Sequence, residues 1–238
     1  MSDGLLFYRQ KDPTASHVRR KYKELQSRDA ALYPDLRCRF SICLGPSSVT
    51  GNHILADALA ACELFTDFGD IVGGGKKRFM CSDLEHRNPP LFLQLDQIGR
   101  SIAEHVLANG PGESFHCIWS LLKNLPGAPS QRSGCLNRLH VDYPLSSRQR
   151  KSSLQPFSVI LGLNGFDLEV CQGDDPRSDP IVLEHVRAGQ YARFTNHCWH
   201  AGGANTSGDA QYRMFFYFVS NVDDFPRDEV YFLDSDAR

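Results

Sequence analysis

The stretch PFSVILGLNGFDLEVCQ, residues 156–172, holds two short apolar segments separated by an Asn-Gly pair. Segments of this length, bounded by turn-forming residues, are typical of β-strands. Further segments of the same kind follow from residue 114 onward, each set off by Gly, Pro, Asn or Asp: 114–123, 136–143, 181–186, 191–196 and 211–220. A series of short strands at this spacing predicts a sandwich, a jelly roll or a barrel.

The chain has a different texture before about residue 110. The segments 52–65 and 90–110 predict helices, and the second begins with Pro90 and ends with Gly110. The basic stretch 16–33 also predicts a helix, whereas LRCRFSICL (36–44) alternates as a half-buried strand does. We therefore expect one domain over residues 1–238, with a helical layer over 1–113, a β core over 114–220 and a tail over 221–238.

Composition restricts the class of protein. With 238 residues and 41% hydrophobic content the chain can bury a sizeable core, and a net charge of −2 gives no strong nucleic-acid signal. We expect no membrane partner, since no segment has the length of a membrane span and no signal peptide is recognisable. The eight cysteines form no CxxC pair, so reduced cysteines and a cytoplasmic or nuclear location are expected.

The segment RLHVDYPL (138–145) carries the first group of candidate metal ligands. Because side chains two apart on a strand share a face, His140 and Asp142 point to the same side. An imidazole and a carboxylate in this arrangement can bind one ion together.

A second group lies in TNHCWHAGG (195–203). His197 and His200 are an odd number of residues apart, so on a continuous strand only one of them faces the interior. We select His200 because the small residues Ala-Gly-Gly follow it and permit close approach. His197 is expected to bond to backbone or solvent. A structural zinc site is disfavoured, because no second close pair of ligands is visible.

Two His and one carboxylate on one side of an ion leave the opposite positions open, which is the arrangement of non-haem Fe(II) oxygenases. Further along, Arg213 is the only cation in the apolar strand QYRMFFYF (211–218). A buried guanidinium needs an anion, and its planar fork suits a carboxylate.

These motifs, HVDY and HAGGANTSGDAQYRMFFYF, resemble the Fe(II)/2-oxoglutarate-dependent oxygenases, over roughly residues 114–220. The resemblance implies a double-stranded β-helix, the cupin-like jelly roll, mainly β with helices outside it. It also implies that His140, Asp142 and His200 hold Fe(II) and that Arg213 binds the far carboxylate of 2-oxoglutarate.

One position departs from the pattern of this superfamily. Many members have Ser or Thr two residues after the Arg, where this chain has Phe215, which leaves a second partner of the cosubstrate carboxylate unassigned. Asn137 and Asn205 flank the expected site. They could bind the cosubstrate or equally satisfy turns.

The implied activity is that of a dioxygenase that uses O2 and 2-oxoglutarate, gives succinate and CO2, and hydroxylates or oxidatively demethylates a substrate. That substrate could be a small molecule, a protein side chain or a nucleobase, since function depends on the loops more than on the fold. Two alternatives stay open: a catalytically silent jelly-roll protein that binds a metal or metabolite, and a cupin-like metalloenzyme that needs no cosubstrate.

Two basic clusters lie outside these motifs. SSRQRKSS (146–153) follows the His-x-Asp segment and is interpreted as a solvated loop, although it could attract an anionic substrate. GGGKKRF (73–79) lacks the spacing of a phosphate-binding loop and is interpreted as a flexible turn.

Overall fold

The computed structural model describes the following residues: 5–9, 21–25, 40–46, 59, 65–67, 77–81, 85, 88–108, 115–132, 139–141, 156–173, 176–195, 198–219 and 229–233. Three candidate site residues of the sequence analysis, Asn137, Asp142 and His197, lie outside these ranges, as does the basic cluster 146–153.

Strands of the described residues form two sheets. The eight-stranded sheet has the order β3-β11-β8-β13-β6-β5-β4, with β1 beside β6. Its neighbouring strands pair antiparallel, except that β1 runs parallel to β6. The strand bounds are β1 Leu5–Arg9, β3 Phe40–Leu44, β4 Phe65–Asp67, β5 Arg78–Cys81, β6 Phe115–Asn124, β8 Phe157–Gly162, β11 Gln190–Thr195 and β13 Gln211–Val219.

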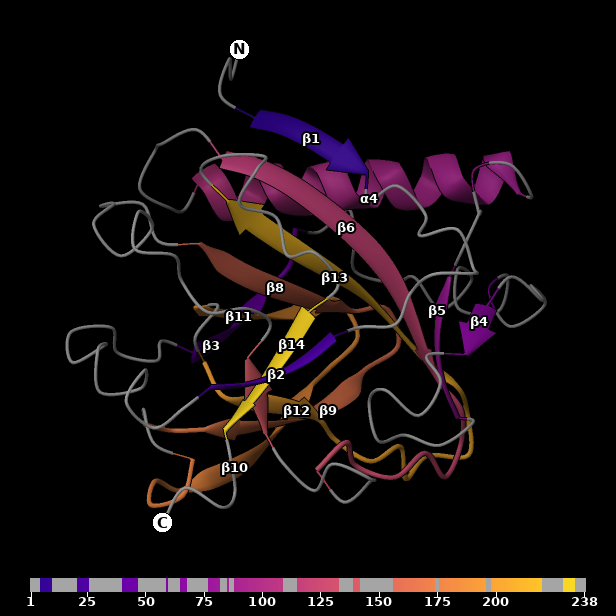
Figure 1. Ribbon diagram of the computed structural model, residues 1–238. Helices are drawn as coiled ribbons and strands as arrows, with labels where there is room; N and C mark the ends of the chain where they lie inside the picture. The colour runs from indigo at the N-terminus through magenta and orange to yellow at the C-terminus, as the bar shows by residue number, and fades with distance from the viewer. Residues whose placement is uncertain are drawn as a thin grey trace.

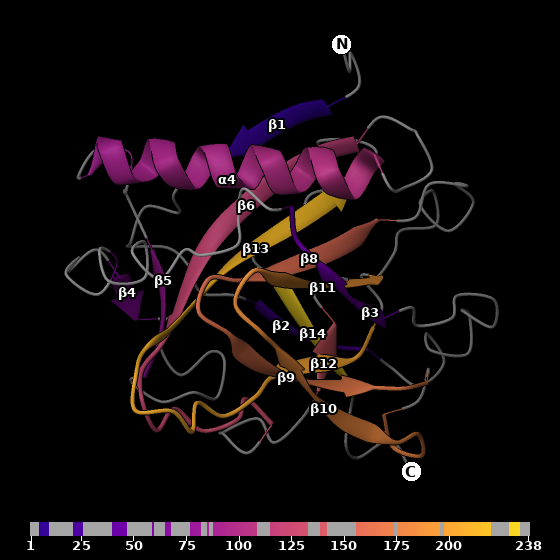
Figure 2. The same ribbon diagram turned by 180° about the vertical axis from the view of Figure 1, so that it is seen from behind.

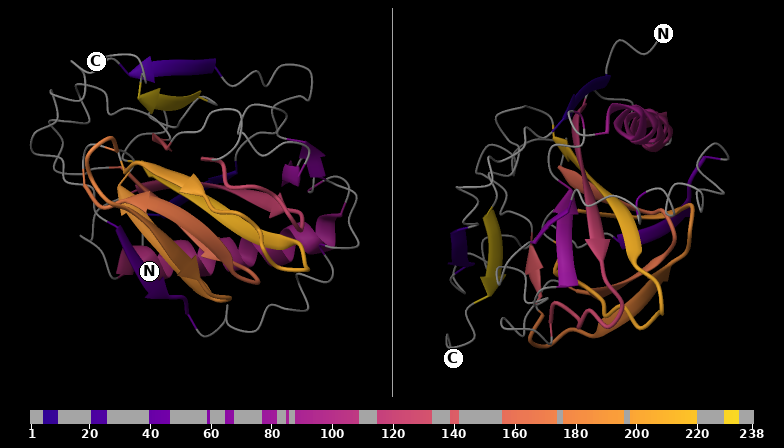
Figure 3. Two further views of the ribbon diagram at one scale, coloured as in Figure 1. Left: turned by 90° about the horizontal axis from the view of Figure 1, so that it is seen from below. Right: turned by 90° about the vertical axis from the view of Figure 1, so that its right-hand side faces the viewer.

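The six-stranded sheet has the order β10-β9-β12-β7-β14-β2. It lies below the larger sheet in Figure 1, and the two sheets form the layers seen in Figure 3. The strand bounds are β2 Lys21–Leu25, β7 His140–Val141, β9 Phe166–Cys171, β10 Ile181–Val186, β12 His200–Gly202 and β14 Glu229–Leu233.

The helix α4, Pro89–Ala108, lies along the outer face of the eight-stranded sheet (Figures 1 and 2). The Asn88 side chain caps it, since Asn88 Oδ1 accepts a hydrogen bond from the Leu91 amide at 3.3 Å. The buried residues of α4 pack against alternate residues of the sheet, which are Phe157, Val159 and Leu161 of β8 and Met214, Phe216 and Phe218 of β13. The residues between them on β13 therefore face the other way.

That other face looks into the space between the two sheets. Ile160 and Phe215 of the large sheet pack there against Phe166, Leu168 and Val170 of the small sheet. Arg213 has the same phase on β13 as Phe215, so its side chain also points between the sheets. The alternation thus separates a helix-facing core from an interior that contains one buried cation on this strand.

The helix expected over 90–110 is confirmed, as are the strands expected from residue 114 onward where those residues are described. The helix expected over 52–65 lies outside the described residues except at Leu59 and Phe65, and Phe65 begins strand β4. The helix expected over 16–33 is wrong for residues 21–25, which form strand β2 and pair with β14. Likewise, the flexible turn expected over 73–79 is wrong at its end, because Arg78 begins strand β5.

The described part of residues 1–113 contributes five strands in addition to α4, so this part of the chain is less helical than expected. Four of these strands, β1, β3, β4 and β5, extend the large sheet, and β2 extends the small one. The division into a layer, a core and a tail stays a prediction.

Among the described helical segments, none combines the length and apolar character that would let it cross a membrane. Cys43, Cys117 and Cys171 are thiols. Cys198 is disulfide-bonded, so the expectation of reduced cysteines is wrong at this position.

Candidate metal and anion site

Two histidines meet on the inner face of the small sheet. His200 on β12 is the direct antiparallel partner of His140 on β7. The centroids of their rings are 4.5 Å apart, with 49° between the ring planes, and both side chains are buried. His140 and His200 are sixty residues apart in the sequence, and the pairing of β7 with β12 brings them together. The two imidazoles are therefore close enough to bind one ion.

The ring of His200 is held in a defined orientation. Its Nδ1 lies 3.0 Å from the carbonyl oxygen of Cys198, which can only accept, so Nδ1 donates this hydrogen bond. The neutral ring then carries its lone pair on Nε2, the form in which imidazole binds a metal. Phe194 packs against the same ring, with the centroids 4.6 Å apart.

The third expected ligand, Asp142, follows His140 by two residues and lies outside the described part of the chain. Within the described residues, no group of three His, Cys, Asp or Glu side chains forms a metal-binding cluster. The pair of histidines fits two of the three ligands of a two-His, one-carboxylate centre. The assignment of His140, Asp142 and His200 as metal ligands stays a prediction.

Arg213 is buried opposite the histidine-bearing sheet, with only 6% of its surface exposed. Its guanidinium carbon lies 5.3 Å from the centroid of the Phe166 ring, a cation–π distance. Among the described residues, no group accepts a hydrogen bond from its buried Nε and Nη1 atoms. Burial lowers the pKa of Arg213 to about 10. The side chain is thus a buried cation whose Nε and Nη1 atoms are available to donate hydrogen bonds.

Gly202 links this cation to the histidines. It lies two residues after His200 on β12, so the two positions share a face and are about 7 Å apart along the strand. A Cβ atom at Gly202 would lie 3.0 Å from Arg213 Nη2, 2.8 Å from Arg78 Nη1 and 2.8 Å from Gln131 Oε1. Two guanidinium groups and the Gln131 amide therefore pack against Gly202 at distances that leave no room for a side chain there.

Arg78 is a site residue that the sequence analysis missed. It begins β5 with 2% of its surface exposed, and its Nη2 donates to the carbonyls of Pro129 at 2.7 Å, Gly202 at 3.2 Å and Gly203 at 2.8 Å. Its Nε and Nη1 are buried and have no acceptor among the described residues. The apolar segment that follows Arg78 was the one local signal of a strand.

The surroundings of Arg78 disfavour its protonated form. Burial is the largest cause that lowers the pKa of Arg78 to about 9, and the positive charge of Arg213 lowers it further. The negative charge of Glu169 acts in the opposite direction. Two like charges therefore share a region with one nearby carboxylate among the described residues.

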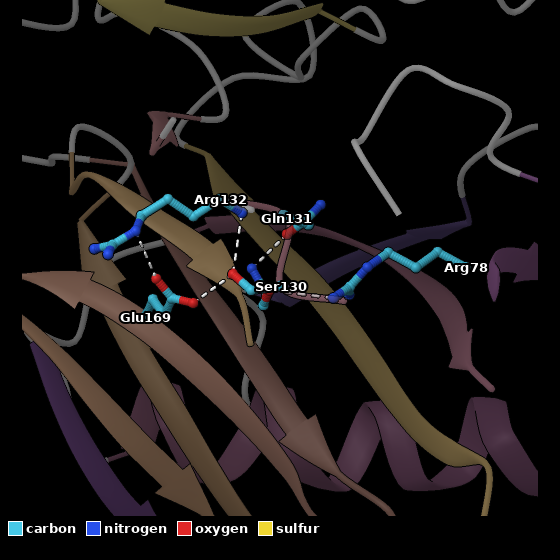
Figure 4. Close-up of polar contacts among 6 residues, drawn as sticks. Arg78, Ser130, Gln131, Arg132 and Glu169 are labelled. Atoms are coloured by element: carbon cyan, nitrogen blue, oxygen red, sulfur yellow. Dashed lines mark hydrogen bonds and ion pairs between the residues drawn. The ribbon is translucent and has the colours of Figure 1, made fainter. Parts of the chain in front are cut away.

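A loop that follows β6 holds this region together, as Figure 4 shows. The Gln131 amide donates to the Gly202 carbonyl at 2.9 Å, and Gln131 Oε1 accepts from the Gly202 amide. Ser130 Oγ donates to one oxygen of Glu169, and Arg132 Nε lies 3.2 Å from the other oxygen. Gln131 thus fixes the backbone of Gly202 on both sides, and Glu169 is oriented by two donors.

Asn205 is buried, and hydrogen bonds engage both of its side-chain polar atoms. Its Nδ2 donates to the carbonyls of Asn124 at 3.1 Å and Asp209 at 2.8 Å, while its Oδ1 accepts from the amide and the hydroxyl of Ser207. This pattern favours the turn-stabilising role, one of the two roles that the sequence left open.

Solved structures identify the architecture. HygX from Streptomyces hygroscopicus, with nickel and 2-oxoglutarate bound, matches with a TM-score of 0.53 and 12% sequence identity, over 77% of this chain and 83% of that chain. A second HygX structure, which also contains hygromycin B, matches with a TM-score of 0.52 and 12% identity, over 82% and 92% of the two chains. The chain has the double-stranded β-helix fold.

The nogalamycin epimerase SnoN, described as non-haem and α-ketoglutarate-dependent, matches with a TM-score of 0.49 and 16% identity, over 81% of each chain. No family model and no curated protein sequence matches this chain. At these identities the likeness to HygX establishes the fold, so the expected double-stranded β-helix is confirmed, and the chemistry has to be argued from the site.

Proposed function

We propose that the protein is an Fe(II)- and 2-oxoglutarate-dependent dioxygenase that hydroxylates or oxidatively demethylates its substrate. One observation carries the proposal: the paired histidines His140 and His200 lie on the strand face that continues to Gly202, where the buried guanidinium of Arg213 lies. A pair of imidazoles and a buried cation on one face suit a ligand that chelates a metal at one end and carries a carboxylate at the other.

The metal would be held by His140, Asp142 and His200. Their chemistry fits Fe(II), because two imidazoles and one carboxylate leave positions open for other ligands. When bound, Fe(II) supplies the centre at which O2 oxidises 2-oxoglutarate to succinate and CO2. The bond from His200 Nδ1 to the Cys198 carbonyl fixes which nitrogen faces the metal.

The cosubstrate would lie along β12. Its keto-acid end would be near His200, and its far carboxylate would reach the guanidinium of Arg213 beside Gly202, about 7 Å further along the strand. Arg213 would neutralise that carboxylate with its Nε and Nη atoms. HygX, which has the same fold, binds nickel and 2-oxoglutarate, and this supports the proposal.

Anaerobic addition of Fe(II) and 2-oxoglutarate to the metal-free protein tests the proposal. We expect a visible metal-to-ligand charge-transfer absorption band. The band should be lost in His200→Ala, which removes a ligand, and weakened in Arg213→Ala, which removes the cation for the far carboxylate. His185→Ala is the matched control, since His185 is in the same sheet but its side chain is 63% exposed.

A band that forms equally in His200→Ala would contradict the assignment of the metal ligands. Absence of the band in the unsubstituted protein, with Fe(II) bound, would contradict the cosubstrate. That result would favour one of the two alternatives, a silent metal-binding jelly roll or a metalloenzyme that needs no cosubstrate.

A further inference from the structure

Two buried cations lie beside Gly202, although the sequence predicted one. Arg78 comes from β5 and Arg213 from β13, both in the large sheet, and both reach across to β12 of the small sheet. Each has a buried Nε and a buried Nη1 without an acceptor among the described residues. Buried charges of this kind are stable only when they are paired or hydrogen-bonded.

The compensation within the described residues is incomplete. Glu169 acts on Arg78, but one oxygen of Glu169 accepts from Ser130 and the other pairs with Arg132. Two guanidinium groups therefore face one carboxylate that already has two partners. An anion bound by the unpaired guanidinium donors would balance the second charge.

The Arg78 side chain is positioned for such an anion. Three backbone carbonyls accept from its Nη2 and hold the guanidinium in place. Its Nη1 lies 2.8 Å from the point that a Cβ on Gly202 would occupy. Nη2 is thus used for anchoring, and the unpaired Nη1 lies on the side of Gly202 that Arg213 also contacts.

We propose that Arg78 is the second cation of the cosubstrate pocket and binds the far carboxylate of 2-oxoglutarate together with Arg213. The inference rests on the proposed function and deepens it. It also assigns the partner that the sequence left open, because this chain has Phe215 where many oxygenases of this type have Ser or Thr. A pocket with two cations selects a dicarboxylate over a monocarboxylate keto acid.

A purely structural role for Arg78 makes a different prediction. If Arg78 only anchors Pro129, Gly202 and Gly203, its loss perturbs the site for every ligand that reaches the metal. If it binds the far carboxylate, its loss affects only ligands that carry this carboxylate. The two roles are separated by comparing 2-oxoglutarate with 2-oxopentanoate, which keeps the keto-acid end and lacks the far carboxylate.

The experiment is anaerobic calorimetric titration of the Fe(II)-loaded protein with each keto acid. We expect Arg78→Gln to lower the affinity for 2-oxoglutarate by about 10- to 100-fold, which is the usual effect of losing a charged hydrogen-bond partner. The affinity for 2-oxopentanoate should not change. Arg100→Gln is the control, since Arg100 is a 55% exposed arginine on α4 that pairs with Asp96.

Arg78→Lys is the second variant, measured with the same two ligands if Arg78→Gln fails to fold. This variant keeps the positive charge and loses the planar fork of the guanidinium. It should therefore lower the affinity for 2-oxoglutarate by less than the loss expected for Arg78→Gln, and it should leave the affinity for 2-oxopentanoate unchanged. Equal losses for both ligands, or no loss for either, would overturn the role of Arg78. Failure of the unsubstituted protein to bind 2-oxoglutarate would instead overturn the proposed function, and this inference with it.

Discussion

Arg78 and Arg213 lie on different strands of one sheet, and each places a guanidinium nitrogen within 3.0 Å of the point where a side chain on Gly202 would begin. Gly202 belongs to the opposite sheet and follows His200 by two residues. The absent side chain therefore has a role, because it lets two guanidinium groups pack against the backbone beside a candidate metal ligand.

Gly202→Ala should displace the two guanidinium groups from their present positions. The new methyl group would lie within 3.0 Å of three side-chain atoms, namely Arg78 Nη1, Gln131 Oε1 and Arg213 Nη2. We expect the affinity for 2-oxoglutarate to fall by at least about tenfold, as for a lost charged hydrogen bond, when measured by titration of the Fe(II)-loaded protein. Gly208→Ala is the control, since a Cβ there meets nothing within 4 Å. Unchanged affinity in Gly202→Ala would place the carboxylate elsewhere.

The affinity for 2-oxoglutarate should depend on pH in the alkaline range. Burial lowers the pKa of Arg78 to about 9 and that of Arg213 to about 10, so both groups lose charge as the pH rises through these values. An anion between them favours the charged forms and raises both pKa values. The affinity should therefore decrease above about pH 9, and binding near pH 9 should take up protons.

Calorimetry at pH 9 in two buffers with different ionisation enthalpies measures this proton uptake. The charged groups that act on Arg78 are Arg213 and Glu169, and Arg132 pairs with Glu169. The same shifts make the free energy of unfolding of the unliganded protein rise between about pH 9 and the ordinary arginine pKa, because the unfolded chain binds more protons there. Affinity that is flat from pH 7 to 10 would contradict the lowered pKa values of Arg78 and Arg213.

Glu169→Gln should have opposite effects on stability and on binding. Loss of this carboxylate removes the charge that favours protonated Arg78, so the melting temperature without ligand should fall, by an amount that corresponds to about 1–3 kcal/mol. The affinity for 2-oxoglutarate should rise, since the pocket becomes more positive. Glu184→Gln on β10 of the same sheet is the control. A decrease in both properties would indicate that Glu169 acts only through Ser130 and Arg132.

Asn205→Ala should reduce stability and leave binding unchanged. Its side chain makes four hydrogen bonds to Asn124, Ser207 and Asp209, so truncation should lower the free energy of unfolding by about 1–3 kcal/mol. Denaturant unfolding and titration with 2-oxoglutarate measure the two quantities. The exposed Thr206→Ala is the control. Weaker binding in Asn205→Ala would support the cosubstrate contact that the sequence left as an alternative.

The strands of the β core were predictable because they are short apolar segments bounded by turn-forming residues. Strands β8 and β13 are buried on both faces, so their sequences are almost continuously apolar. His200 was chosen over His197 because only one of the two can face the interior of a continuous strand, and the structure places His200 beside His140. The helix expected over 16–33 failed because β2 is defined by pairing with β14, a partner some 200 residues away along the chain.

Arg78 could not be found locally. Its neighbours Lys76 and Lys77 and the three glycines before them have the composition of a solvated turn. Its burial depends on carbonyls of Gly202 and Gly203, which are 124 and 125 residues later in the sequence. Contacts at this separation leave no periodic pattern, so the second cation became visible only in three dimensions.

The most direct test of the account is the yield of succinate from 2-oxoglutarate in the presence of Fe(II) and O2. The account predicts that the unsubstituted protein forms succinate and CO2, and that His140→Ala and Asp142→Ala do not, while His185→Ala does. Succinate formation that survives in the His140 or Asp142 variant, or that is absent from the Fe(II)-loaded unsubstituted protein, would contradict the proposed function.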